Sequence, residues 1–253
     1  MQDAPALTEI RAELDALDDE IHALLMRRAA AVARLAASAA KPAGTVLRPG
    51  REAAILRRLL ARHSGPLPRV ALVRIWREVF ASSIAQQGGL SVAVPPEIPV
   101  GRLALEHFGA GTALKPQPSL AAALAAVSAK AAAAAVLPWP REGDEAGQEW
   151  WMRLDGTLQV VARLPFLAAG TPPLEAAIVA LHPADDSGAD MCLFRIESAG
   201  EEGRATIAAR HPGARVLAMR RDAGLTRTLL EGPEVPAGAV ALGRYAIPER
   251  GAA

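Results

Sequence analysis

The chain has 253 residues, 51% of them hydrophobic, which is enough to bury a core in one large or two small domains. Its 28 basic and 27 acidic side chains leave a formal charge of +1. No overall field therefore favours nucleic acid or a membrane surface, and an anion has to be recognised by a local cluster. The single cysteine, Cys192, excludes an internal disulfide framework and suits a reducing compartment. Because the first residues lack a signal-peptide pattern, we expect the cytoplasm.

The sequence contains no clear pattern for a membrane span, a metal site or a nucleotide-binding loop. The longest apolar run, residues 120–138, is dominated by alanine and interrupted by Lys130, so we expect no membrane span. The five histidines are scattered without the spacing of metal ligands, and the chain contains no GxGxxG or GxxxxGK loop. We therefore expect neither a metal nor a cofactor.

Three helices and no strands are expected in residues 1–88. The first covers residues 5 to about 40, where Lys41-Pro42-Ala43-Gly44 ends it. The second follows Pro49-Gly50, and the third begins at Pro68, a residue suited to a first helical turn. Two rows with a seven-residue repeat form an apolar seam on the first helix. These rows are Leu7, Leu14, Ile21, Arg28 and Leu35, and Ile10, Leu17, Leu24 and Ala31.

After Gly89 the pattern changes to alternating strands and helices, the order of a parallel sheet with crossover helices. We expect strands at 90–94, 112–116 and 133–139, with helices at 100–109 and 119–130, the latter capped by Ser119. A linker with two tryptophans leads to a strand at 158–166, and residues 191–248 give strands and one helix of a small α+β module. The fold class is therefore multi-domain, with divisions at 1–88, 89–183 and 184–253.

Arg28 stands where the seam of the first helix calls for an apolar residue. An arginine does not lose its proton, and an uncompensated buried charge costs several kcal/mol, so we expect an anionic partner. The other two helices carry polar residues on their apolar stripes as well: Ser83 and Gln87 on the third, and Glu52 beside Arg51 on the second. Each alone fits an ordinary solvent-exposed helix end. Together they predict a pocket in a helical bundle for a small di-anion.

Arg11 lies seventeen residues before Arg28, roughly 25 Å along a helix with a rise of about 1.5 Å per residue. One helix cannot place both arginines on one small ligand. If both bind the same anion, Arg11 has to come from an antiparallel second copy, which predicts a homodimer with shared sites. The length of the helix and its apolar seam also call for such a partner.

These helices resemble the all-α chorismate mutases of the entwined-dimer type, which also form the N-terminal module of bifunctional mutase–dehydratases. The resemblance spans residues 7–87 and rests on IRAELDALDDEIHALLMRR, RPGREAAILRRLL and LVRIWREVFASSIAQQ. It implies conversion of chorismate to prephenate, a pericyclic step that needs no nucleophile, metal or proton-transfer pair.

By the same resemblance, Arg28 and the partner copy's Arg11 clamp carboxylates, and Arg51 assists. Glu52 holds the ring hydroxyl, Ser83 supports a carboxylate, and Gln87 donates to the ether oxygen. One departure stands out, because Ala39 occupies the place of a lysine that contacts the ether oxygen in the family. We expect that Lys41 substitutes for it or that the mutase is slow or inactive, since losing such a donor costs about 100- to 1,000-fold in rate. Arg48, where the family often has an acidic residue, is a lesser departure.

The C-terminal part more distantly resembles a truncated prephenate dehydratase followed by an ACT regulatory module. Trp139-Pro140 replaces the expected Glu-Asn pair, and the 253 residues contain no Thr-Arg-Phe motif and no room for a second lobe. We therefore expect no dehydratase activity. The ACT ligand motifs are degenerate, with GEEGRATI and MRRDAG in their places, so either a structural remnant or a regulatory site fits.

Two alternatives to the mutase remain open. An isochorismate pyruvate-lyase shares the helical fold and the arginine clamp, although the dehydratase-like tail argues against it. A catalytically dead mutase that acts as a binding or regulatory protein is suggested by Ala39.

Overall fold

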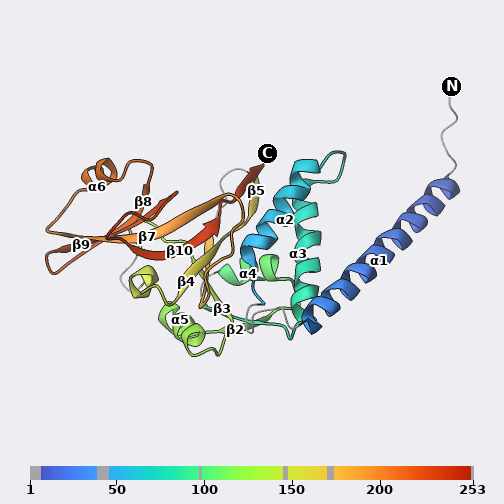
Figure 1. The fold of residues 1–253 in the computed structure, drawn as a ribbon, viewed down its shortest axis with the longest axis horizontal. Coiled ribbons are helices and arrows are strands. Elements are labelled where there is room, and N and C mark those ends of the chain that lie inside the picture. The colour runs from blue at the N-terminus through green and yellow to red at the C-terminus, as the bar shows by residue number, and fades with distance from the viewer. Residues whose placement is uncertain (1–6, 39–45, 97–98, 145–147, 170–173, 252–253) are drawn as a thin grey trace, which may run out of the picture.

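The computed structural model describes residues 7–38, 46–96, 99–144, 148–169 and 174–251. Three helices come first, as predicted, and a mixed sheet with short helices follows (Figure 1). The helices are α1 (Leu7–Ala37), α2 (Pro49–Arg62), α3 (Arg69–Ala85), α4 (Val100–Phe108), α5 (Leu120–Ser128) and α6 (Arg204–Arg210), with a short 3₁₀ turn, η1, at Trp150–Arg153. The strands are β1 (Ser91–Val94), β2 (Ala113–Pro116), β3 (Ala134–Pro138), β4 (Gln159–Leu164), β5 (Leu167–Ala169), β6 (Ala176–Ala180), β7 (Asp190–Ala199), β8 (Arg215–Asp222), β9 (Leu225–Gly232), β10 (Val240–Ala246) and β11 (Glu249–Gly251).

The predicted βαβαβ unit is confirmed by the pairing of β1 with both β2 and β3 in parallel. Ser119 caps α5 as expected, because its Oγ accepts a hydrogen bond from the backbone N–H of Ala122 at 3.1 Å. The sequence reasoning missed β6, a short alanine-rich strand that lies antiparallel between β3 and β4. It also treated residues 141–151 as a polar linker, whereas Trp150 and Trp151 are buried in the core beside α5.

One nine-stranded sheet runs through both halves of the α/β part, in the order β2-β1-β3-β6-β4-β10-β7-β9-β8. The two halves meet where β10 pairs in parallel with β4 at Gly243 and Val160. The division predicted at residue 183 stays a prediction, and the sheet continues across it. In the part of the chain that the structure describes, no helix is both long and apolar enough to cross a membrane.

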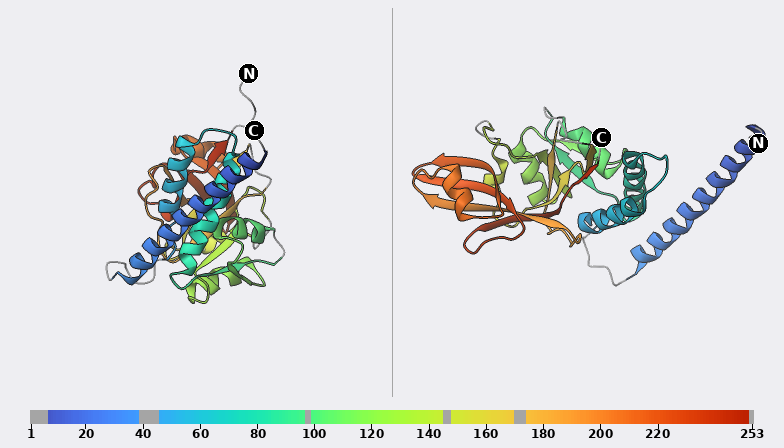
Figure 2. Two further views of the ribbon diagram at one scale, coloured as in Figure 1. Left: turned by 90° about the vertical axis from the view of Figure 1, so that its right-hand side faces the viewer. Right: turned by 90° about the horizontal axis from the view of Figure 1, so that it is seen from above.

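Helix α1 extends away from the rest of the chain and contacts α3 through Arg28, whereas α2 and α3 pack against the sheet part (Figures 1 and 2). No residue of α1 is buried, and the leucines and isoleucines of its seam are exposed. By contrast, α2 and α3 share an apolar cluster with the segment that joins β4 to β5. This cluster contains Ala53, Leu56, Leu60, Leu72, Phe80, Phe166 and Leu167.

Two polar anchors hold α2 to the sheet part. The Asp185 carboxylate accepts hydrogen bonds from the backbone N–H groups of Gly50 (3.1 Å) and Arg51 (3.0 Å), so it caps the N-terminus of α2 from 135 residues away. The Arg57 guanidinium contacts Glu249 at 2.9 Å and donates to the carbonyl oxygens of Ala189 and Ile247. The second helix is therefore positioned by the C-terminal part of the chain.

We expect Gly243→Ala to weaken the junction between the two halves of the sheet. Gly243 has φ +151°, and a Cβ there would lie 2.1 Å from the carbonyl oxygen of Val160. Because backbone has to move to admit it, the free energy of unfolding should fall by about 1–3 kcal/mol in urea titrations. Gly111→Ala is the matched control, since nothing lies within 4 Å of the added Cβ. Equal stability of the two variants would contradict this account of the junction.

Candidate active site

Arg28, in the C-terminal third of α1, contacts the C-terminal part of α3. Its Nη1 donates to the Ser83 hydroxyl at 2.6 Å and to the Val79 carbonyl oxygen at 3.3 Å. The Ser83 hydroxyl in turn donates to Val79, and the Gln87 side-chain amide donates to the Ser83 carbonyl oxygen at 2.7 Å. The structure therefore brings together three of the residues that the sequence singled out: Arg28, Ser83 and Gln87.

The expected anionic partner of Arg28 is not found among the described residues, whose contacts with its guanidinium come from neutral oxygens and the Phe80 ring. Burial, and then the positive charge of Arg51, lower the pKa of Arg28. Arginine nevertheless stays protonated, so the half-buried guanidinium carries an uncompensated charge close to a second cation. An anion bound there would offset the cost of burying this charge and the repulsion from Arg51.

Glu52 lies deeper than the sequence suggested, in a buried ion pair. Its Oε2 is 2.7 Å from Nη1 of Arg77, and the two residues are 8% and 4% exposed. Burial raises the pKa of Glu52 and lowers the pKa of Arg77, and the opposite charge of each partner counters the shift. The sequence did not indicate Arg77 as the partner of Glu52, because the two residues are 25 positions apart and lie on different helices.

Phe80 connects the two arginines of this region. The Cζ atoms of Arg28 and Arg77 each lie 6.0 Å from the centroid of its ring. A guanidinium at this distance is attracted by the ring quadrupole. The ring thereby helps to keep both cations near the end of α3 that bears Ser83.

The other predicted site residues that the structure describes make no hydrogen bond with Arg28. Arg51 and Arg11 are exposed, and in this single copy seventeen residues of the same helix separate Arg11 from Arg28. Arg48 forms an ion pair with Asp185 at 3.3 Å. Lys41 and Ala39 lie outside the described residues. Within the described part of the chain, no three His, Cys, Asp or Glu side chains gather in a way that could hold a metal.

The helical segment that carries this site is similar to known proteins. Residues 10–88 match the family model of chorismate mutase type II. The bifunctional chorismate mutase/prephenate dehydratase of Neisseria gonorrhoeae is 36% identical over 104 residues, which cover 39% of this chain and 27% of that protein. The enzyme of the same name from Stutzerimonas stutzeri is 33% identical over 127 residues, covering 47% of this chain and 35% of its own length.

The second of these matches covers more of the chain than residues 1–88 contain, so the similarity continues into the α/β part. The chain nevertheless spans only about a third of the length of these curated relatives. Among solved structures, a prephenate dehydratase from Arthrobacter aurescens in complex with L-Phe covers 65% of this chain and 92% of its own, with 11% identity and a TM-score of 0.47. At that score the likeness assigns no activity to the α/β part.

Residues 10–88 match the family model of chorismate mutase type II, and the similarity to a bifunctional chorismate mutase/prephenate dehydratase continues into the mixed α/β region that follows.

Proposed function

We propose that this protein is a chorismate mutase, which rearranges chorismate to prephenate for aromatic amino-acid biosynthesis. The observation that carries the proposal is the contact of Arg28 with Ser83 at 2.6 Å, next to Gln87, in a segment that matches the mutase family. A cation and neutral donors side by side suit a substrate with carboxylates and an ether oxygen.

The rearrangement moves the enolpyruvyl group within one molecule, so catalysis consists of holding the reactive conformer and stabilising charge. Arg28 binds a carboxylate in the bidentate manner that a guanidinium allows, and Ser83 supports it. Gln87 donates to the ether oxygen, where negative charge grows as the carbon–oxygen bond breaks. Arg51 adds positive charge, and Lys41 is proposed as a further donor.

Glu52 is proposed to hold the ring hydroxyl of the substrate. Its Oε2 is bound to Arg77, and its Oε1 has no hydrogen bond to any described residue. Because Arg77 holds only Oε2, the other oxygen remains to accept a hydrogen bond from the hydroxyl. This arrangement orients the ring without proton transfer.

The exposed seam of α1 supports a homodimer. A 31-residue helix with no buried residue and a continuous row of exposed leucines and isoleucines is stable only when another surface covers that row. An antiparallel second copy of α1 would cover it and bring Arg11 of the partner subunit to Arg28. We therefore propose that each site is shared between two copies.

We further propose that the chain lacks dehydratase activity and acts in the cytoplasm. The first proposal rests on Trp139-Pro140 and on the missing Thr-Arg-Phe motif, and the second on the single, unpaired Cys192. Incubation of prephenate with the purified protein, with phenylpyruvate as the product to detect, tests the first.

A weak or dead mutase that acts as a binding protein is the second candidate, favoured by Ala39. We expect Ala39→Lys to raise kcat for chorismate by about 100- to 1,000-fold, because it restores a donor at the developing charge. The assay follows chorismate loss and identifies the product. Ala36→Lys on the exposed side of α1 is the control for added charge.

Prephenate formed by the unmodified chain supports the mutase. Turnover that appears only with Ala39→Lys identifies a pseudoenzyme. Pyruvate released from isochorismate would instead select the lyase.

A further inference from the structure

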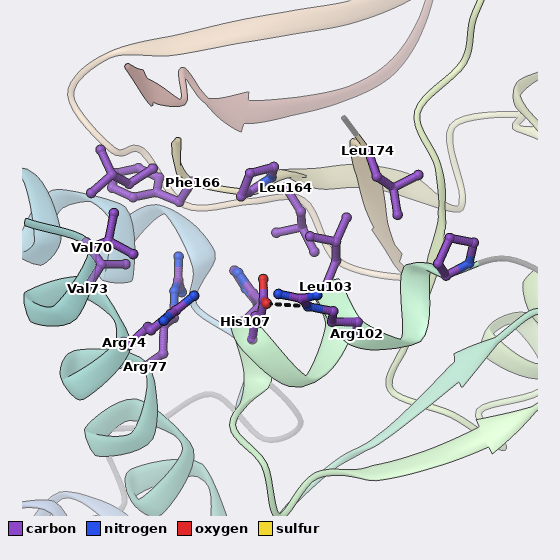
Figure 3. Close-up of a pocket in the computed structure, with 14 residues that line it drawn as sticks. Val70, Val73, Arg74, Arg77, Arg102, Leu103, His107, Leu164, Phe166 and Leu174 are labelled. Carbon is purple, nitrogen blue, oxygen red and sulfur yellow. Dashed lines mark hydrogen bonds and ion pairs between the residues drawn. The ribbon is translucent and has the colours of Figure 1, made fainter. Parts of the chain in front are cut away.

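A pocket of about 600 Å³ lies between α3, α4 and the segment that joins β4 to β5 (Figure 3). Nine of its fourteen lining residues are apolar, and Val73, Leu103, Leu164, Phe166 and Leu174 supply much of the wall. A pocket of this size and apolar character lies in the range of small-molecule binding sites. It is separate from Ser83 and Gln87, neither of which lines it.

One end of this pocket is cationic. Arg74, Arg77 and His107 extend into it from α3 and α4 (Figure 3). Arg77 is already paired with Glu52, and Arg102 at the rim is paired with Glu106 at 2.9 Å. Arg74, by contrast, makes no hydrogen bond or ion pair with any described residue, so its whole guanidinium is available to a ligand.

His107 supplies an independent sign of a ligand. It is 6% exposed, and its Nε2 has no hydrogen-bond partner among the residues that the structure describes. Burial, and then the charge of Arg77, lower the pKa of His107 well below its usual value, so the ring is neutral at neutral pH. A buried polar nitrogen without a partner is costly, and a ligand oxygen placed at Nε2 removes that cost.

We propose that this pocket binds a small molecule that carries one carboxylate on an apolar, aryl-sized body. The carboxylate lies between Arg74 and His107, which donates from Nε2, and the body packs against Phe166 and Leu103. A dianionic group fits less well, because the Glu106 carboxylate also lines the pocket and two of the three arginines are already paired. Arg77 lines this pocket and also holds Glu52, but Arg28, Ser83 and Gln87 do not line it, and the proposal does not depend on the mutase function.

Calorimetric titration of the full chain with 3-phenylpropanoate tests the proposal. We expect saturable binding, weakened about tenfold or more by Arg74→Gln, because a hydrogen bond to a charged group contributes about 1.5–3 kcal/mol. His107→Leu should weaken binding similarly, and His107→Gln, which keeps a donor, should weaken it less. Arg74 is exposed, so its variant tests the site even if a variant of buried His107 fails to fold.

Two controls locate the ligand. Arg62→Gln, on the exposed end of α2, and Arg28→Ala should both bind 3-phenylpropanoate with unchanged affinity. The uncharged 3-phenylpropan-1-ol and inorganic phosphate should bind at least about tenfold more weakly. The proposal is overturned if 3-phenylpropanoate does not bind, if Arg74→Gln leaves its affinity unchanged, if Arg28→Ala abolishes its binding, or if phosphate or the alcohol binds as well as the carboxylate.

Discussion

Replacing Arg28 with alanine is expected to lower kcat/KM for chorismate by about 100- to 1,000-fold, the usual effect of removing one preorganised donor from developing charge. Arg28 is the residue that joins α1 to Ser83 and Val79 of α3, and its cation has no carboxylate partner among the described residues. The measurement is chorismate loss under saturating and limiting substrate. Should the unmodified chain be slow, the same comparison is made in the Ala39→Lys background.

Arg27→Ala is the matched control for this variant. Arg27 is the preceding residue of α1 and is exposed, so its removal takes away the same charge and the same helix-forming side chain without touching α3. Its kcat/KM should stay within a factor of about three, because surface substitutions of this kind change little. Equal losses in both variants would mean that Arg28 acts only through net charge.

Removal of the Glu52 carboxylate is expected to cost about 3–5 kcal/mol of the free energy of unfolding, because it leaves the buried Arg77 cation without a partner. Arg77 is 4% exposed and lies 2.7 Å from Glu52, so solvent cannot take the place of the carboxylate. Urea unfolding of Glu52→Ala, followed by circular dichroism, gives the value. Glu52→Gln should lose less, since its amide oxygen still accepts a hydrogen bond from Arg77.

The double variant Glu52→Leu with Arg77→Met separates the loss of charge pairing from the loss of packing. It removes both charges and keeps apolar volume beside Phe80 and Phe166, so its stability should lie close to that of the unmodified chain. A double variant as unstable as Glu52→Ala would contradict the description of this pair as mutually dependent buried charges.

Sequence patterns were sufficient for features that depend on neighbouring residues. The cap at Ser119 and the seven-residue repeat of α1 are local signals, and each corresponds to an observed element or exposed face. The predicted break at Lys41-Pro42-Ala43-Gly44 lies outside the described residues. The stripe that placed Ser83 and Gln87 together on the third helix also depends only on helical spacing. Arg28 was recognisable because its charge conflicts with the seam.

Contacts between residues that lie far apart in the sequence could not be predicted from such local patterns. Asp185 caps α2 across 135 residues, and no property of Gly50 or Asp185 in the sequence indicates the other. The pairing of β10 with β4 joins two segments that each look complete, through the single pair Gly243–Val160. The sequence did not predict β6 because three of its five residues are alanine. Alanine has a low strand propensity, and this segment forms a strand because neighbouring strands bury it.

These distant contacts matter for the site. Asp185 and Arg57 fix α2 on the sheet part, α2 carries Glu52, and Glu52 fixes Arg77 of α3. The positions of Glu52 and Arg51 relative to Arg28 therefore depend on residues after 180. We infer that the α/β part holds α2 and Glu52 in position for the helical site.

The shared site is the central claim, and mixing two impaired variants tests it most directly. Arg11→Ala and Arg28→Ala should each retain at most about 1% of the activity alone. When equal amounts are unfolded and refolded together, half of the dimers should be mixed, and each mixed dimer of a symmetric pair contains one intact site. The account predicts recovery of about a quarter of the activity of the unmodified chain. Activity that stays at the level of the separate variants would contradict a site built from Arg28 of one subunit and Arg11 of the other.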